Sequence, residues 1–163
     1  KNYALCTVHR AENTDSPKPL ISIITVLQEI NKSLPVVLPL HPRTQNLLRN
    51  WGASKLLESL TILEPVSYLE MQRLEMGAKV ILTDSGGMQK EAYFHGVPCI
   101  TLREETEWVE TVDLGWNQLA GANKERILNA YNHSMNTVPK KIISVFGSGG
   151  AATKCVEYLL SSK

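Results

Sequence analysis

The chain has 163 residues, of which 43% are hydrophobic and 20% are charged, with a formal net charge of +1. This size fits one globular domain that buries roughly two thirds of its unfolded surface. The balanced charge argues against a nucleic-acid partner and an acidic membrane surface, and no apolar run approaches the roughly 20 residues that span a bilayer.

The predicted elements begin with an apolar run over residues 3–8, typical of a strand. After a polar loop, apolar residues recur at helical spacing from Pro17 until Pro35 ends the helix, and an apolar run over 36–40 predicts the second strand. The alternation continues with helices over 45–60, 67–76, 88–95, 124–134 and 151–160, and with strands over 61–63, 79–83, 98–102 and 118–120.

Apolar strands that alternate with helices predict a Rossmann-like α/β fold, a parallel sheet with helices on both faces. We expect one domain over residues 1–163. Residue 1 is Lys and a strand starts by Tyr3, so we expect the chain to be part of a longer protein. Cys6 and Cys99 lie in predicted strands as buried thiols, and no signal-peptide pattern is present, which favours a cytoplasmic protein.

In an open parallel sheet, ligands bind outside the carboxyl ends of the strands. Polar residues concentrate at these ends in five segments, residues 9–13, 41–43, 64–65, 84–87 and 103–107. We therefore expect the functional site at this edge of the sheet.

The sharpest local signal is an apolar strand that runs into Ser85-Gly86-Gly87 and then a helix. Two glycines let backbone N–H groups approach an anion closely, and the start of a helix carries a partial positive charge, which favours phosphate binding. The alternative is a plain turn in which Asp84 or Ser85 caps the helix. A second glycine-rich turn over 147–150 favours a flexible helix start over an anion site.

Three ionisable residues at this edge have both a functional and a structural interpretation. Glu91 could accept hydrogen bonds from a ribose diol or be a solvated helix residue. His9 and His41 could act as acid, base or charge stabiliser near neutral pH, or be structural. Neither histidine has a partner at metal-site spacing, so we expect no metal.

Taken together, the motifs resemble the non-hydrolysing UDP-N-acetylglucosamine 2-epimerases in order and spacing. The segments that carry the resemblance are His9-Arg10-Ala11-Glu12-Asn13, His41-Pro42, Glu64-Pro65 followed by Tyr68-Leu69, and Thr83-Asp84-Ser85-Gly86-Gly87-Met88-Gln89-Lys90-Glu91-Ala92. Residues 103–110 and 147–151 extend it, so the resemblance covers nearly the whole chain.

The resemblance implies that this chain is the UDP-binding C-terminal domain of a GT-B-type two-domain enzyme whose N-terminal domain is absent. It assigns the diphosphate to Ser85, Gly86 and Gly87, the ribose hydroxyls to Glu91, and the uracil to the segment near Val66 and Met71.

The family reaction eliminates UDP across C1 and C2 of the sugar and adds it back with the opposite configuration at C2. By resemblance, His9 is the active-site histidine that stabilises the departing diphosphate, and Arg10 and His41 line the cleft and a regulatory UDP-sugar site. The resemblance implies no cofactor and a homodimeric full-length enzyme. The family's essential carboxylates lie in the other domain, so we expect this chain alone to bind UDP weakly and to be inactive.

The chain departs from common members of the family at three places. Trp108 stands where an arginine is usual, a variant that resembles the branch acting on UDP-2,3-diacetamido-2,3-dideoxy-glucuronate, so both sugars remain candidates. Met71 replaces an aromatic ring, and Ser148 and Gly150 replace an acid and a lysine. Two other functions remain open, a retaining GT-B-type glycosyltransferase and a noncatalytic UDP-sugar sensor.

Overall fold

The structure is a computed structural model that describes residues 2–137, 145–147 and 149–161. In this part of the chain six strands form one sheet in the order β3-β2-β1-β4-β5-β6, and each neighbouring pair is parallel. The strands are β1 (Ala4–Thr7), β2 (Val36–Pro39), β3 (Thr61–Leu63), β4 (Val80–Thr83), β5 (Cys99–Thr101) and β6 (Asn117–Leu119). The predicted parallel sheet is confirmed.

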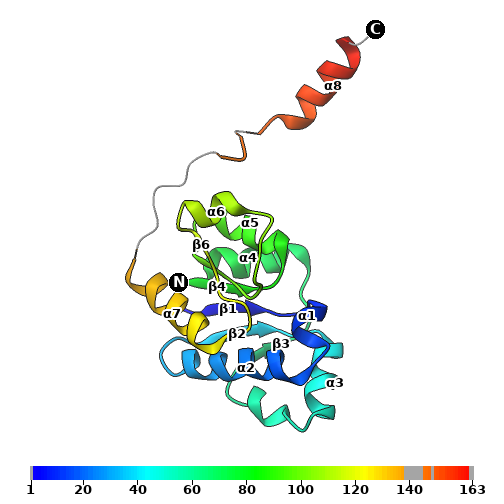
Figure 1. The fold of residues 1–163 in the computed structure, drawn as a ribbon. Helices are drawn as coiled ribbons and strands as arrows, with labels where there is room; N and C mark the ends of the chain where they lie inside the picture. Colours follow the sequence, from blue (N-terminus) through cyan, green and yellow to red (C-terminus); the bar gives the residue numbers. More distant parts are fainter. Residues whose placement is uncertain (1, 138–144, 148, 162–163) are drawn as a thin grey trace.

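Helices cover both faces of the sheet (Figure 1). They are α1 (Ala11–Thr14), α2 (Pro17–Asn31), α3 (Pro42–Asn50), the 3₁₀ helix η1 (Ser54–Leu57), α4 (Tyr68–Gly77), α5 (Gly86–Phe94), α6 (Val109–Asp113), α7 (Lys124–Asn136) and α8 (Ala151–Ser161). Because successive strand residues point to opposite faces, Cys6 packs with α2 and α7 while Leu5 packs with α4 and α5. Both layers are apolar, which explains the continuous apolar character of the strands.

The predicted helix over 45–60 is wrong as one element. Helix α3 starts three residues earlier, at Pro42, and ends at Asn50, before Gly52, whose φ is +67°. The N–H of Ala53 donates to the carbonyl of Leu48 at 2.8 Å, which closes the helix with a left-handed glycine turn before η1 begins.

Two short helices lie where no helix was predicted. Helix α1 occupies the expected polar loop, and its first turn is held by the carbonyl of Arg10, which accepts from the N–H groups of Asn13 and Thr14 at 3.0 Å. Helix α6 follows Trp108. Both are shorter than two turns, which is too short for apolar periodicity to reveal them.

Helix α8 differs from the other long helices because every one of its residues is exposed. Figure 1 shows it apart from the two helical layers. Cys155 on α8 is exposed, whereas Cys6 and Cys99 are buried free thiols as expected. Across the described part of the chain, no helix has the length and apolar character needed to cross a membrane.

Candidate functional site

The carboxyl ends of β1 and β2 meet the start of α4 around a cavity of about 230 Å³. Four of the predicted site residues line it, His9, His41, Val66 and Met71. Five further residues that were not predicted as site residues complete the lining, Thr7, Val8, Pro39, Pro65 and Met88. Ligand pockets are usually roughly 300–1,000 Å³. This cavity therefore suits one flat, largely apolar ring, with the rest of a ligand in the open cleft.

The two predicted histidines both line this cavity and have different surroundings. His9 follows β1, and its Nδ1 is 3.4 Å from Oδ1 of the buried Asp84. His41 is the N-cap of α3, where its Nδ1 accepts a hydrogen bond from the N–H of Arg43 at 3.1 Å. His41 therefore has a structural task as a helix cap, while the carboxylate partner of His9 is one that the sequence spacing did not reveal.

Helix α5 begins directly at the end of β4, two residues earlier than predicted. Ser85 is its N-cap, and the Ser85 Oγ accepts from the N–H of Met88 at 3.5 Å. The first N–H groups of a helix have no intrahelical partner, so those of Gly86 and Gly87 point out of its amino terminus. The capping and phosphate-binding interpretations of this turn are therefore compatible.

The two glycines of this turn differ in what surrounds them. A Cβ atom on Gly87 would meet only Ser85 Oγ within 4 Å, at 3.8 Å, so the approach to this residue is open. A Cβ atom on Gly86 would lie 3.4 Å from Glu107 Oε2 and 3.9 Å from Arg10 Nη2. The predicted residue Arg10 thus places its guanidinium beside the turn, where it can add positive charge for an anion.

Trp108 also contacts this turn, in a role that the sequence did not predict. Its Nε1–H donates to the carbonyl of Gly86 at 2.7 Å. The Nζ of Lys90 lies 4.3 Å from the centroid of the Trp108 ring and 4.5 Å from that of Phe146. Trp108 therefore connects the first turn of α5 to the 145–147 segment.

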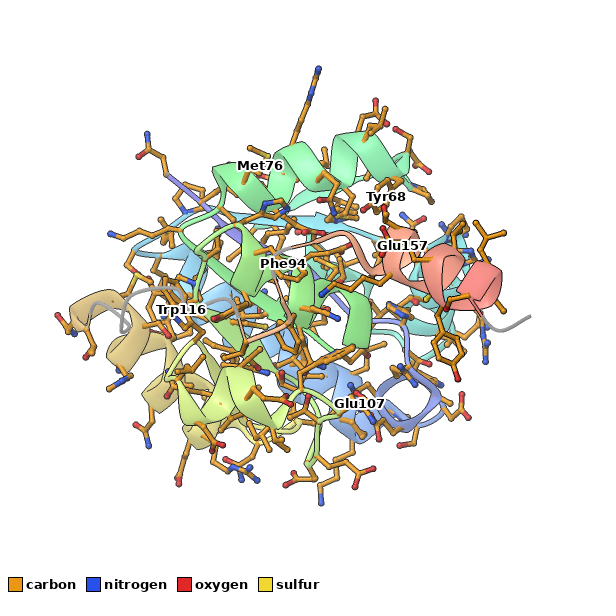
Figure 2. The ribbon with its side chains drawn as sticks, turned by 90° about the horizontal axis from the view of Figure 1, so that it is seen from above. Tyr68, Met76, Phe94, Glu107, Trp116 and Glu157 are labelled. Carbon is orange, nitrogen blue, oxygen red and sulfur yellow. The ribbon has the colours of Figure 1, made fainter. Side chains whose placement is uncertain are left out.

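Glu91 lies outside the first cavity. It lines a second cavity of about 400 Å³ between α4 and α5, with Tyr68, Gln72, Gly87, Lys90, Phe94 and His95. Figure 2 shows Tyr68 and Phe94 on these neighbouring helices. The Tyr68 hydroxyl donates to Glu91 Oε1 at 3.2 Å, and the charge of Glu91 raises the pKa of Tyr68. Residues of α4 and α5 line both cavities, but no single residue lines both of them.

A buried acid next to Glu91 was missed at the sequence level. Glu75 on α4 is fully buried, and its Oε2 is 3.6 Å from Nε2 of His95. Burial, followed by the charge of Glu91, raises the pKa of Glu75 from 4.5 to about 8. An acid on an amphipathic helix is normally read as solvent-facing, so the sequence carried no signal for this pair.

Arg103, after β5, is the centre of a second unpredicted network. It is 9% exposed, and its guanidinium lies 3.1 Å from Glu12 and 3.0 Å from Glu107. A hydrogen bond within Glu107 itself and the contact with Arg103 lower the pKa of Glu107. The network fixes the loop that carries Trp108 against α1. Within the described residues, no group of three or more His, Cys, Asp or Glu side chains is placed to hold a metal ion.

Comparison with known proteins places this geometry in a family. Residues 1–160 match the family model described as UDP-N-acetylglucosamine 2-epimerase. The chain belongs to this family. It is 49% identical to a UDP-N-acetylglucosamine 2-epimerase homolog of Methanococcus maripaludis, covering 98% of this chain and 44% of the relative. It is 44% identical to the UDP-2,3-diacetamido-2,3-dideoxy-D-glucuronate 2-epimerase of Pseudomonas aeruginosa, covering 96% and 44%.

Solved structures agree with this assignment. The UDP-GlcNAc 2-epimerase of Methanocaldococcus jannaschii, solved in complex with UDP-GlcNAc and UDP, superimposes with a TM-score of 0.87 at 40% identity, over 98% of this chain and 45% of that one. The chain thus spans less than half the length of the family members it matches. The expected fold class is confirmed, a Rossmann-like sheet that corresponds to the C-terminal half of a GT-B-type architecture.

Proposed function

We propose that this chain is the UDP-binding half of an epimerase that inverts C2 of UDP-N-acetylglucosamine or a related UDP-2-acetamido sugar. The observation that carries the proposal is the open, capped amino terminus of α5, which lies beside an apolar cavity at the carboxyl edge of the sheet. A helix amino terminus binds an anion and an apolar cavity binds a flat ring, the two parts of a nucleoside diphosphate.

In this proposal the uracil enters the first cavity, where Val66 and Met71 provide apolar contacts. The diphosphate lies on the N–H groups of the turn formed by Ser85, Gly86 and Gly87. Preorganised N–H groups and a helix dipole stabilise the negative charge of a phosphate without rearranging when it arrives. The Arg10 guanidinium also lies beside Gly86, next to the carboxylate of Glu107, which is nearer to this glycine.

Glu91 takes the ribose hydroxyls. It is four residues after Gly87, so both lie on one face of α5, and both line the second cavity. The Tyr68 hydroxyl donates to one oxygen of the Glu91 carboxylate. A ribose diol would bond the same carboxylate, so Tyr68 would share it or move aside.

The proposed chemistry is elimination of UDP across C1 and C2 of the sugar, followed by its re-addition on the other configuration at C2. His9 would stabilise the departing diphosphate as a hydrogen-bond donor. The group that takes the proton from C2 would belong to a further N-terminal domain, which this chain would need as its partner. Helix α8, whose residues are all exposed, offers apolar surface that suits such contact, and the whole enzyme would be a homodimer.

The sugar remains a choice between two classes within this proposal. The relatives include UDP-N-acetylglucosamine 2-epimerases and an epimerase of a 2,3-diacetamido uronate, at 40% and 44% identity. A glycosyltransferase is less well supported, because the similarity to the heptosyltransferase of E. coli, at 17% identity, concerns the fold alone.

Calorimetric titration of this chain with UDP and, separately, with UMP tests the proposal. We expect UDP to bind more tightly than UMP, because only UDP places two phosphates on the start of α5. Equal affinity for the two nucleotides would refute the assignment of the diphosphate to Ser85, Gly86 and Gly87. Absence of binding by either would refute the chain as a UDP-binding unit.

A further inference from the structure

Asp84, the first residue after β4, is a buried carboxylate that joins the ends of three strands. It is 0% exposed, and its Oδ2 accepts from the N–H of Arg10 at 2.9 Å, from the N–H of His9 at 3.1 Å and from Nδ2 of Asn13 at 3.0 Å. The same Nδ2 of Asn13 donates to the carbonyl of Leu102, after β5, at 2.9 Å. The carboxylate therefore organises the turn that carries His9.

A buried carboxylate is stable only when hydrogen-bond donors or a charged partner surround it, and an ionisable side chain would add to the donors of Asp84 already named. The imidazole of His9 provides one, with Nδ1 3.4 Å from Oδ1. The nearby thiol of Cys6 cannot do so, since burial and the charge of Asp84 both raise its pKa. Arg10 sends its guanidinium toward Gly86 and Glu107 and contributes only its backbone N–H to Asp84.

We propose that Asp84 is a positioning residue for His9, which holds the imidazole by its Nδ1–H so that Nε2 faces the cleft. The inference rests on the proposed function, in which His9 contacts the diphosphate. The contact with Asp84 gives a physical reason for the orientation of His9. It also explains why an acid is tolerated next to the turn proposed to bind an anion.

The orientation follows from the shape of imidazole. The two nitrogens lie on different sides of the ring, so a ring whose Nδ1 is held by Asp84 presents Nε2 on the side that faces away from this carboxylate. His9 is half-exposed and lines the first cavity. When Nε2 carries a proton, the imidazolium donates a hydrogen bond to a phosphate oxygen, and the carboxylate of Asp84 balances its charge. No proton needs to be transferred in this contact.

A purely structural role for Asp84 is the competing interpretation, because the same carboxylate anchors the backbone of His9 and Arg10. The two roles differ in whether the effect of Asp84 passes through the imidazole. A double-mutant cycle between Asp84 and His9 separates them, since only residues that act through one another show non-additive effects.

The first test is the tautomer of His9 in the unliganded chain, read from the ¹⁵N chemical shifts of its ring at a pH where the ring is neutral. We expect the proton on Nδ1. A proton on Nε2, with Nδ1 bare, would overturn the proposal. This measurement needs neither a variant nor a ligand, so it stays decisive if Asp84→Asn fails to fold, and it does not depend on whether UDP binds.

The second test is the affinity for UDP in the cycle of Asp84→Asn, His9→Ala and the double variant, with Asp15→Asn as the control. Asp15 is an exposed aspartate that pairs with Arg43 at 3.4 Å. We expect Asp84→Asn to weaken binding roughly tenfold when His9 is present and to add no loss when it is Ala. An equal loss in both backgrounds would show a structural role and refute the proposal. If wild-type chain binds no UDP while the proton lies on Nδ1, the proposed function fails and the positioning of His9 stands.

Discussion

Two helices of this protein follow a stretch of serine and glycines in the sequence, and only one of them packs against the sheet. Helix α5 starts after Ser85, is capped by its hydroxyl, and buries Met88, Ala92 and Tyr93. Helix α8 starts after the 147–150 turn, and none of its described residues is buried. Similar residues therefore have different structural roles, depending on whether they directly follow the carboxyl end of a strand in the sheet.

The glycines of the two turns serve different physical needs. Gly147, Gly149 and Gly150 have φ values of 84°, 91° and 78°, a region that glycine enters most easily. None of the positive φ values belongs to the α5 turn. Gly87 is helical, so its lack of a side chain leaves space in front of the helix and is not needed for the backbone conformation. Ser148, which lies between these glycines in the sequence, is outside the described residues.

Among the substitutions that test the difference between the two turns, the largest effect is expected at Gly87. Gly87→Ala adds a methyl group that the fold accommodates but that stands where the phosphate would lie, so we expect UDP affinity to fall by about 2–3 kcal/mol through lost hydrogen bonds. The unfolding free energy should rise by roughly 0.5–1 kcal/mol, because alanine favours a helix more than glycine does.

The matched control is Gly150→Ala, in the turn before α8. Its positive φ predicts a small loss of stability and no change in UDP affinity, measured by calorimetry and by urea unfolding. Equal loss of affinity in the two variants would show that the turns are not functionally different.

The other end of α5 is expected to give the next largest effect. Glu75 lies beside His95, the C-cap of α5, and its pKa is raised from 4.5 to about 8. Folded protein then holds a proton that unfolded protein releases between these pH values. Stability is therefore full below pH 4.5 and declines until the pH passes about 8.

Glu75→Gln removes this titration and keeps the shape of the side chain. We expect it to raise the unfolding free energy at pH above 8 by about 2 kcal/mol relative to wild type, with little difference at pH 4. Urea unfolding across this pH range measures it. Glu157→Gln on the exposed α8 is the control, and its stability should follow the same pH dependence as the wild type because it keeps Glu75. A parallel pH dependence in the wild type and in Glu75→Gln would contradict the assignment.

A smaller effect is expected where Trp108 holds the first turn of α5. Trp108→Phe keeps an aromatic ring but removes the N–H that donates to Gly86, so we expect a loss of about 1 kcal/mol in thermal or urea unfolding. Trp116→Phe is the matched control, because the buried Nε1 of Trp116 has no hydrogen-bond partner among the residues that the structure describes. A loss for Trp116→Phe as large as that for Trp108→Phe would show that ring volume, not the hydrogen bond, matters.

The smallest effect is expected at α8. Removing residues 151–163 takes away a helix with no buried side chain, so the unfolding free energy of the sheet domain should change by less than about 0.5 kcal/mol. Urea unfolding of the shortened chain checks this. A loss of several kcal/mol would show that α8 belongs to the core of this domain.

The sequence predicted the sheet well, because the apolar runs of the strands are buried on both faces and leave a clear signal. It also located Ser85, Gly86 and Gly87, since a strand followed by glycines and a helix is a local pattern. It could not predict contacts between distant segments. Asp84 with His9 and Trp108 with Gly86 are 75 and 22 residues apart, and only the sheet order brings them together.

The error in the predicted helix over 45–60 has a local cause. The break after Asn50 depends on one glycine inside a helical pattern, which local propensity tolerates. Glu91 was predicted to share the opening of the phosphate turn. The structure places Glu91 and Gly87 around one cavity, which is separate from the cavity lined by Val66 and Met71.

The most direct test of the account is an NMR titration of the ¹⁵N-labelled chain with UDP, following the backbone amides of its glycines. We expect the amide signals of Gly86 and Gly87 to shift most, together with those near Met71, while the signals of Gly147 and Gly149 stay unchanged. Larger shifts at Gly147 and Gly149 than at Gly86 and Gly87 would contradict it, because the diphosphate would then bind at the turn before α8 and not at the start of α5.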